Sequence, residues 1–394
     1  MTELLSSAFF PGAGATSTPH SLSRRVLVSV GEASGDAMAA AVAQQLDAPI
    51  FGMTGPELEA LGSERVANVT SQAALGWLDV ITASPRAVGA YRRLLDRARE
   101  LMPKVALLVG HSEVNARLGV ALRRQGTRVL WYAPPQVWVW RPKRVFALRH
   151  AADAVACLLP FERNLWQRAG VAAHYVGHPA LEMDLLSRTE ARRELGLTPY
   201  AEVAAILPGS RTREVQRTLP ALLAAASELR EERGAFDARV LLAPTLDDRV
   251  VAWASALALR HDVRVSRLRP RQVLSAFDVA LATSGTVTLE CALAGVAPVI
   301  VYRTDALSSA LLRRMLRVPN VGLPNLVLGR RAFPELLQEE LTPTAVTHAA
   351  LDILDEPEEY AARLREVRRT LEDETNPRSP SARVADVLKT WLND

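Results

Sequence analysis

Two short turns in the second half of the chain have the residue types that bind a phosphate group. A Thr-Ser-Gly-Thr turn at 283–286 follows the apolar run 279–282, and a Pro-Gly-Ser-Arg turn at 208–211 follows the apolar run 205–207. Each turn leads into a helix pattern. Small residues at such a turn leave backbone N–H groups at a helix N-terminus, where the helix dipole favours an anion. The pattern predicts a phosphate site built from both turns.

Three side chains, two at these turns and one further along the chain, extend the prediction to a nucleotide site. The guanidinium of Arg211 matches the oxygens of a diphosphate and supplies charge without a metal ion. Glu290, early on the helix after the 283–286 turn, offers a carboxylate that can accept hydrogen bonds from ribose hydroxyls. Asn325 is a polar residue in an apolar stretch and can reach the same cleft. The alternative is structural: a surface Arg at a helix start, a Glu on a solvated helix face and an Asn in an ordinary loop.

The first half of the chain carries a different turn. Residues 31–36 are Gly-Glu-Ala-Ser-Gly-Asp and lie between an apolar run and an Ala-rich helix pattern. They lack the spacing of a dinucleotide fingerprint and of a P-loop, and their two acids suit a hydroxyl-rich ligand better than a pyrophosphate. His178, in a Gly-His-Pro turn that ends a predicted strand, can orient a phosphate or sugar, although a single His in a turn is more often structural. No spacing of His, Cys, Asp and Glu is typical of a metal site.

The elements that position these turns alternate regularly. Apolar strand patterns alternate with helix patterns in two successive series, which predicts an α/β protein with two Rossmann-like lobes facing a cleft. We expect the first lobe over 24–190 and the second over 200–375, because the chain between them is charged and has no strand pattern. A C-terminal helix over 376–394 is expected to pack back on the first lobe, and 1–23 to form a disordered extension.

Composition limits the class of protein. The 394 residues carry a formal net charge of +4 and are 49% hydrophobic, enough for two buried cores. This mild basic excess suits phosphates or an anionic membrane surface, and the chain has no basic, aromatic-rich tract of the nucleic-acid type. The two cysteines, Cys157 and Cys291, lie in apolar runs and are predicted to be buried free thiols. No run reaches the roughly 18 apolar residues of a membrane span.

Taken in order, the motifs resemble those of the lipid-A-disaccharide synthase family, inverting glycosyltransferases of the two-lobed GT-B type. The resemblance covers about residues 25–390. Beyond the three turns above, it rests on Gln-Val-Trp-Val-Trp-Arg at 136–141 with Lys-Arg-Val at 143–145, Leu-Pro-Phe-Glu at 159–162, Val-Gly-His-Pro at 176–179, Leu-Glu at 289–290 and Leu-Pro-Asn-Leu at 323–326. Each motif is weak alone, and their common order makes the resemblance strong.

The resemblance implies a reaction. The 6-hydroxyl of 2,3-diacylglucosamine 1-phosphate attacks the anomeric carbon of UDP-2,3-diacylglucosamine, UDP leaves, and the β-1,6-linked lipid A disaccharide 1-phosphate forms. The resemblance also implies a cytoplasmic enzyme, peripherally associated with the inner membrane of a Gram-negative bacterium. Such an enzyme works without a metal ion or other cofactor, does not bind nucleic acid and is compatible with a homodimer.

The resemblance further assigns residues to each substrate. The UDP site would be lined by Arg211, Ser284, Gly285, Thr286, Glu290 and Asn325. The acceptor and its acyl chains would contact Trp138, Trp140, Arg141 and His178, with Trp77, Val137, Lys143 and Arg144 as further candidates. For the tryptophans, the alternative is plain core packing.

The first lobe departs from the family at the expected catalytic base. Family members usually carry Asp-x-Pro-Asp-Phe-Asn after the strand that corresponds to 105–109, and the first Asp is the expected base. In this chain Gly110 takes that position. A base must reach the attacking hydroxyl, and the candidates to replace the missing Asp are His111, Glu113 and Asp36.

A second departure lies on the same side, where the usual Met-Gly-Gly turn is Met-Thr-Gly at 53–55. Because both changes fall in the acceptor lobe, alternatives to the implied reaction stay open. They are a related GT-B enzyme with another acceptor, a UDP-sugar epimerase, and a non-catalytic paralogue that binds UDP-sugar or glycolipid.

Overall fold

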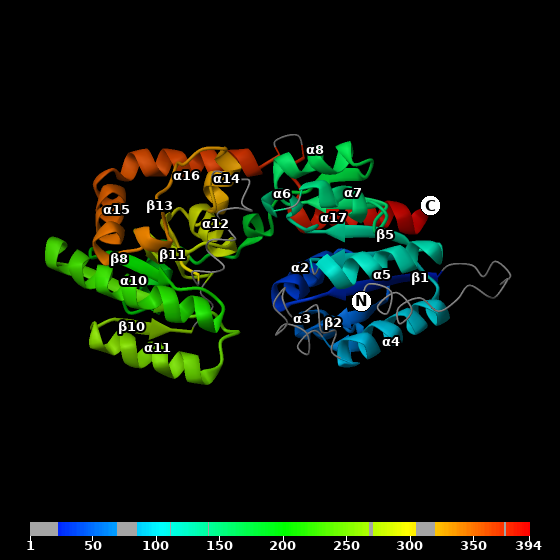
Figure 1. Ribbon diagram of the computed structural model, residues 1–394, viewed down its shortest axis with the longest axis horizontal. Helices are drawn as coiled ribbons and strands as arrows, with labels where there is room; N and C mark the ends of the chain where they lie inside the picture. Colours follow the sequence, from blue (N-terminus) through cyan, green and yellow to red (C-terminus); the bar gives the residue numbers. More distant parts are fainter. Residues whose placement is uncertain are drawn as a thin grey trace. The chain divides into compact units, whose positions relative to one another are not determined.

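The protein contains two parallel β-sheets with helices packed against them (Figure 1). This confirms the predicted α/β class with two Rossmann-like sheets. The computed structural model describes residues 23–68, 85–110, 112–140, 142–267, 271–304, 320–373 and 376–394. All but the last residue of the expected extension lies outside these ranges, as do the candidates Trp77, His111 and Arg141, and only the backbone of Trp140 is described.

The first sheet has the strand order β3-β2-β1-β4-β5-β6-β7. Its strands are β1 (Ser23–Val30), β2 (Ile50–Thr54), β3 (Glu64–Asn68), β4 (Pro103–Val109), β5 (Arg128–Tyr132), β6 (Ala154–Cys157) and β7 (Ala172–Tyr175). Its helical segments are α2 (Ala33–Ala43), α3 (Pro56–Ala60), α4 (Pro85–Leu101), α5 (Ser112–Arg124), α6 (Val137–Trp140), η3 (Pro142–Arg144), α7 (Val145–Leu148), α8 (Pro160–Arg168) and η4 (Pro179–Glu182). Strands β1 and β4 are parallel neighbours with Val26 opposite Val105. Both are covered on two faces, so their apolar residues are nearly continuous.

The second sheet has the order β10-β9-β8-β11-β12-β13. Its strands are β8 (Glu202–Leu207), β9 (Phe236–Leu241), β10 (Arg264–Ser266), β11 (Val279–Thr283), β12 (Ala297–Tyr302) and β13 (Glu335–Leu337). Its helical segments are α9 (Arg188–Glu194), α10 (Thr212–Arg233), α11 (Asp248–Arg260), η5 (Leu274–Ala276), α12 (Thr286–Leu293), α14 (Leu323–Leu328), η6 (Gln338–Glu340), α15 (Pro343–Asp355) and α16 (Pro357–Leu371). The last helix, α17 (Pro380–Asn393), does not belong to this sheet. This strand order is typical of nucleotide-binding sheets.

Apolar residues pack on both faces of the second sheet. Leu281 lies in the core under α10 and α15, whereas Ala280 and Ala282 face the core under η5 on the other side. Both cysteines, Cys157 and Cys291, are buried and free, as predicted. Among the described residues no helix is long and apolar enough to cross a membrane.

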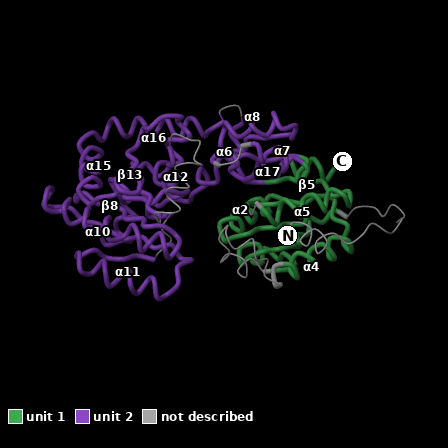
Figure 2. The backbone as a smooth tube through the Cα atoms, viewed as in Figure 1, with its two compact units in different colours: residues 1–131, 150–153, 387–394 green, residues 132–149, 154–386 purple. Residues whose placement is uncertain are grey.

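The chain divides into two compact units, coloured in Figure 2. Unit 1 holds residues 1–131, 150–153 and 387–394, and unit 2 holds residues 132–149 and 154–386. The last residues of α17 therefore lie with the first strands, where Lys104 Nζ donates to the Leu392 carbonyl at 3.0 Å. This confirms that the C-terminal helix returns to the first sheet. The domain boundary between 190 and 200 stays a prediction.

Candidate functional site

The two predicted phosphate turns lie side by side in the second sheet. Strands β8 and β11 are parallel neighbours, with Leu207 opposite Ala282. The 208–211 turn follows the first strand and the 283–286 turn begins at the end of the second. The strand order reverses between β8 and β11, and ligands of open parallel sheets bind at the carboxyl ends of the strands where this occurs.

The 208–211 turn is held by an acid on the helix that follows it. The Glu214 carboxylate accepts from the backbone N–H groups of Ser210 at 3.2 Å and Arg211 at 3.3 Å, and from the Arg211 guanidinium at 3.0 Å. Gly209 has φ +113°, and a Cβ there would lie 2.8 Å from Cβ of Glu214. The Glu214 carboxylate thus uses these two N–H groups. The Arg211 side chain is 80% exposed, so it is the part of this turn that can meet an anion.

The 283–286 turn offers the start of a helix. Gly285 and Thr286 are exposed at the N-terminus of α12, and within the described residues no side chain caps this helix. The Thr288 N–H donates to the Gly285 carbonyl at 3.2 Å, so the N–H groups of Thr286 and Val287 are the first-turn donors that can meet an anion. The polar groups of Ser284 are used within the protein and not for an anion. Its hydroxyl donates to the Val321 carbonyl at 2.9 Å, and its N–H donates to the Val301 carbonyl at 2.8 Å. It ties the turn to β12 and the 320–322 segment.

Glu290 does not lie on a solvated face. Its side chain is 7% exposed, and Oε1 lies 2.8 Å from a guanidinium nitrogen of Arg271. Burial raises the pKa of Glu290 above its usual range, while Arg271 acts to lower it. Arg271 precedes η5 and belongs to none of the motifs, so no local pattern identifies it.

His178 lies close to the same arginine. Helix α12 contacts η4, which begins directly after His178. The ring is buried, and its Nδ1 accepts from the Ala180 N–H at 3.1 Å. Burial, with a further contribution from Arg271, lowers the pKa of His178 to about 4. His178 is therefore neutral near pH 7 and belongs, with Arg271 and Glu290, to unit 2.

His178→Asn should make the protein less sensitive to acid. A neutral native His with a pKa of about 4 stabilises the fold above its unfolded value of 6.5, and this contribution is lost as pH falls from about 6.5 to about 4. The Asn oxygen can still accept from Ala180. Between pH 7 and 4.5, the free energy of unfolding should fall by about 2 kcal/mol more in the wild type than in the variant. Urea unfolding at both pH values measures this, and equal losses would contradict it.

Asn325 supports the 320–322 loop through Glu335, whose carboxylate accepts from the Val321 N–H at 3.1 Å and from the Gly322 N–H at 2.9 Å. Its amide oxygen accepts from the Ala332 and Phe333 N–H groups at 2.8 Å, and its amide nitrogen donates to the Phe333 carbonyl and to Glu335 Oε1. The side chain is fully buried, and its two donors and two acceptor sites are used. Asn325 thus positions this loop and has no polar group left for a nucleotide.

Asp36 is committed to the turn before α3. Its Oδ1 accepts from the Gly55 N–H and its Oδ2 from the Glu57 N–H, each at 2.8 Å, and the side chain is buried. The carboxylate thereby satisfies N–H groups at a helix start. We assign it this structural role in place of the proposed proton transfer, because both oxygens face α3.

The Gly110 turn is fixed by its neighbours. The Gly110 carbonyl accepts from Asn115 Nδ2 at 3.0 Å and from Trp131 Nε1 at 3.1 Å. Gly110 has φ +56°, and a Cβ built on it meets no atom within 4 Å. Glu113 is half-buried in the first turn of α5. The turn therefore presents open space at the position of the family's Asp, with one acid on the adjoining helix.

The aromatic segment after β5 contains a short helix, α6. The prolines at 134 and 135 precede the helix, where no intrahelical N–H is lost. Trp138 Nε1 donates to Glu162 Oε1 at 3.0 Å, and its ring meets Phe161 edge-on at 5.0 Å between centroids. Val137 is buried, so core packing accounts for it.

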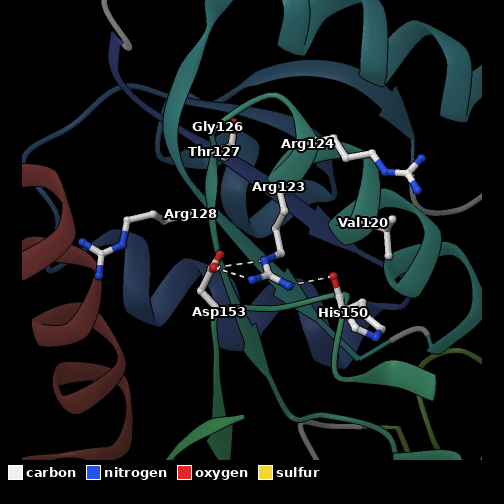
Figure 3. Close-up of a pocket in the computed structure, with 8 residues that line it drawn as sticks. All are labelled: Val120, Arg123, Arg124, Gly126, Thr127, Arg128, His150 and Asp153. Atoms are coloured by element: carbon white, nitrogen blue, oxygen red, sulfur yellow. Dashed lines mark hydrogen bonds and ion pairs between the residues drawn. The ribbon is translucent and has the colours of Figure 1, made fainter. Parts of the chain in front are cut away.

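Unit 1 contains a hollow of about 440 Å³ at the amino end of β5 (Figure 3). It is lined by Val120, Arg123, Arg124, Gly126, Thr127, Arg128, His150 and Asp153. Arg123 Nε donates to Asp153 Oδ1 at 2.9 Å, and Arg128 pairs with Asp394 at 2.6 Å. The hollow lies at the strand edge opposite to Gly110, and two of its cations, Arg123 and Arg128, are paired with acids, so we do not assign it to the site.

Asp153→Asn should lower the free energy of unfolding by about 1–2 kcal/mol. Its Oδ2 accepts from the Val129 N–H at 2.8 Å while Oδ1 pairs with Arg123, so one carboxylate joins β5 to α5. Asp394→Asn is the matched control, because the Arg128–Asp394 pair is about half exposed and should contribute below about 1 kcal/mol. Denaturant unfolding of both variants measures the difference, and equal effects would contradict the assignment.

No group of three or more His, Cys, Asp or Glu residues in the described part of the chain could hold a metal ion. The expectation that the site works without a metal or other cofactor stays a prediction.

Comparison with known proteins gives a consistent match. A family model described as "Lipid-A-disaccharide synthetase" matches residues 26–386. The lipid-A-disaccharide synthase of Myxococcus xanthus (strain DK1622) is 37% identical over 329 residues, which cover 82% of this chain and 86% of the relative. The lipid-A-disaccharide synthase of Anaeromyxobacter dehalogenans (strain 2CP-C) is 34% identical over 377 residues, covering 93% and 98%.

Solved structures share the fold at low identity. UDP-GlcNAc 2-epimerase from Neisseria meningitidis, bound to UDP-GlcNAc, aligns with a TM-score of 0.60 at 11% identity, covering 93% of this chain and 99% of that one. Sucrose-phosphate synthase from Thermosynechococcus elongatus aligns with a TM-score of 0.59 at 14% identity, covering 94% and 99%. These likenesses show the GT-B type of fold.

Proposed function

Because the chain belongs to the lipid-A-disaccharide synthase family of hexosyltransferases, we propose that it joins UDP-2,3-diacylglucosamine to 2,3-diacylglucosamine 1-phosphate. The products are the β-1,6-linked disaccharide 1-phosphate and UDP. The family acts by glycosyl transfer in lipid A biosynthesis, and inversion at the anomeric carbon belongs to the proposal. Its main support in the structure comes from two neighbouring strands, β8 and β11. The exposed Arg211 lies on the turn after β8, and α12, whose start has no side-chain cap among the described residues, follows β11.

The leaving diphosphate needs positive charge as its bond to the sugar breaks. Arg211 and the first N–H groups of α12 can supply that charge at one edge of the sheet. The acceptor oxygen forms the new bond to the anomeric carbon from the opposite face, and its proton passes to a base. Since a guanidinium and a helix N-terminus provide the electrostatic stabilisation, we propose that no metal ion or other cofactor is required.

The acceptor is proposed to come from the cytoplasmic face of the inner membrane. In unit 2, Phe146 is 51% exposed and Phe161 is 37% exposed, and Lys143, three residues before Phe146, is exposed as well. Exposed aromatic rings contact acyl chains, and a cation nearby favours an anionic headgroup or the 1-phosphate. The half-buried Trp138, held by Glu162, supports the ring of Phe161.

The direct test is incubation of the protein with UDP-2,3-diacylglucosamine and the 1-phosphate acceptor. We expect release of UDP in step with disaccharide 1-phosphate, and a β-1,6 linkage by NMR. UDP release without disaccharide would indicate another acceptor, and recovery of a 2-epimerised sugar nucleotide would indicate an epimerase.

Gly110 favours one other function. It occupies the position of the family's expected base, so the chain can be a paralogue that binds UDP-sugar or glycolipid with a changed acceptor or without turnover. Such a protein would bind UDP through Arg211 and form no disaccharide in the same assay.

A further inference from the structure

Glu290 lies directly behind the exposed start of α12. It follows Thr286 by one helical turn, and residues four apart lie on the same face of a helix, about 6 Å from each other. Thr286 is exposed, whereas the Glu290 side chain is 7% exposed. A nucleotide whose phosphates meet the N-terminus of α12 would therefore have its ribose near this carboxylate.

A buried carboxylate requires a partner to stay ionised and in one orientation. Arg271 supplies it, with 2.8 Å between a guanidinium nitrogen and Glu290 Oε1. The Arg271 side chain is 53% exposed, so it approaches the buried acid from the solvent side. His178, which also lies near Arg271, is neutral near pH 7 and adds no charge to the pair.

We propose that Arg271 is a positioning residue, which orients the Glu290 carboxylate so that it accepts hydrogen bonds from the ribose hydroxyls and makes the site selective for ribonucleotides. The inference rests on the proposed function, because it requires UDP to bind between the two turns. It adds to that function a residue outside every motif and a property, discrimination against 2′-deoxyribose, that Arg211 cannot provide. Arg211 would recognise the diphosphate, which is the same in both nucleotides.

The test compares UDP with 2′-deoxy-UDP by calorimetry in the wild type, Arg271→Gln and Arg271→Lys. In the wild type we expect 2′-deoxy-UDP to bind about 10- to 100-fold more weakly, since a hydrogen bond to a charged group is lost. In Arg271→Gln this ratio should fall below about threefold. Arg271→Lys keeps a cation and should restore part of the ratio.

Each result gives a distinct answer. Equal weakening of both nucleotides in Arg271→Gln, with the ratio unchanged, would mean that Arg271 only supports the fold and would overturn the inference. Equal binding of both nucleotides to the wild type would overturn it as well, because Glu290 would then not contact the 2′-hydroxyl. If the wild type binds neither nucleotide, the proposed function itself fails. Melting curves of the ligand-free variants show that they are folded.

Discussion

Glu113→Gln is expected to lower disaccharide formation by about 10²- to 10⁴-fold, the usual contribution of a general base. Glu113 lies in the first turn of α5, directly after the β4 end where the family's Asp would stand. Gln has nearly the same shape but cannot take the proton of the attacking hydroxyl. UDP should still raise the melting temperature, because the donor turns belong to the second sheet. Steady-state turnover and thermal shifts measure the two effects.

Full activity in Glu113→Gln would remove Glu113 from the mechanism. The same measurement on His111→Ala then tests the other candidate, which lies outside the described residues. Loss of UDP binding in either variant would show damage beyond the acceptor side and would contradict the assignment of a base.

A rescue experiment uses the open space at Gly110. Asp and Asn are the side chains that best tolerate the left-handed backbone found there, and a Cβ meets no atom within 4 Å. Gly110→Asp in the Glu113→Gln background should recover turnover by about tenfold or more, because a carboxylate returns to the family's position. Gly110→Asn is the matched control, since it has the same shape and no base. Equal activity of the Asp and Asn variants would contradict a base at this turn.

Arg211→Ala is the second large change, with an expected loss of about 10²- to 10³-fold in turnover. The guanidinium is 80% exposed, is tethered by Glu214 and lies on the turn after β8, the strand next to β11. Its removal would take away the cation that we propose for the diphosphate. At a UDP concentration 100 times Kd, the wild type should gain about 5 to 10 °C in melting temperature. Arg211→Ala should lose this gain.

Arg213→Ala is the control for Arg211→Ala. Arg213 is exposed on the first turn of the same helix, and its removal changes the charge of the protein equally. We expect its thermal shift with UDP to match the wild type within about 1 °C, because its charge is screened by solvent. A full UDP shift in Arg211→Ala would exclude the two turns as the diphosphate site.

Most of the fold follows from local patterns. Strands β8 and β11 are continuous apolar runs, because a parallel strand between two helical layers is buried on both faces. The glycine turns after them mark the carboxyl edge of the sheet. Edge strands do not follow in this way: β3 begins with Glu64 and Arg65, and β13 has three residues, so neither has an apolar run. Their positions come from pairing with β2 and β12.

For the candidate site, too, local sequence patterns predict one part and tertiary structure determines the other. Residue types and spacing predicted the two turns between strand and helix, with Arg211 on one of them, because such a turn is local in the chain. That these turns bind a diphosphate stays a prediction. Tertiary structure decided which polar groups remain available, since hydrogen-bond partners come from distant segments. The Asp36 carboxylate binds an N–H group at the start of α3, and the Asn325 amide binds the 332–335 segment. Glu290 is buried and pairs with Arg271. Helix α12 has small or apolar residues on most sides, so only its packing shows that Glu290 points inward.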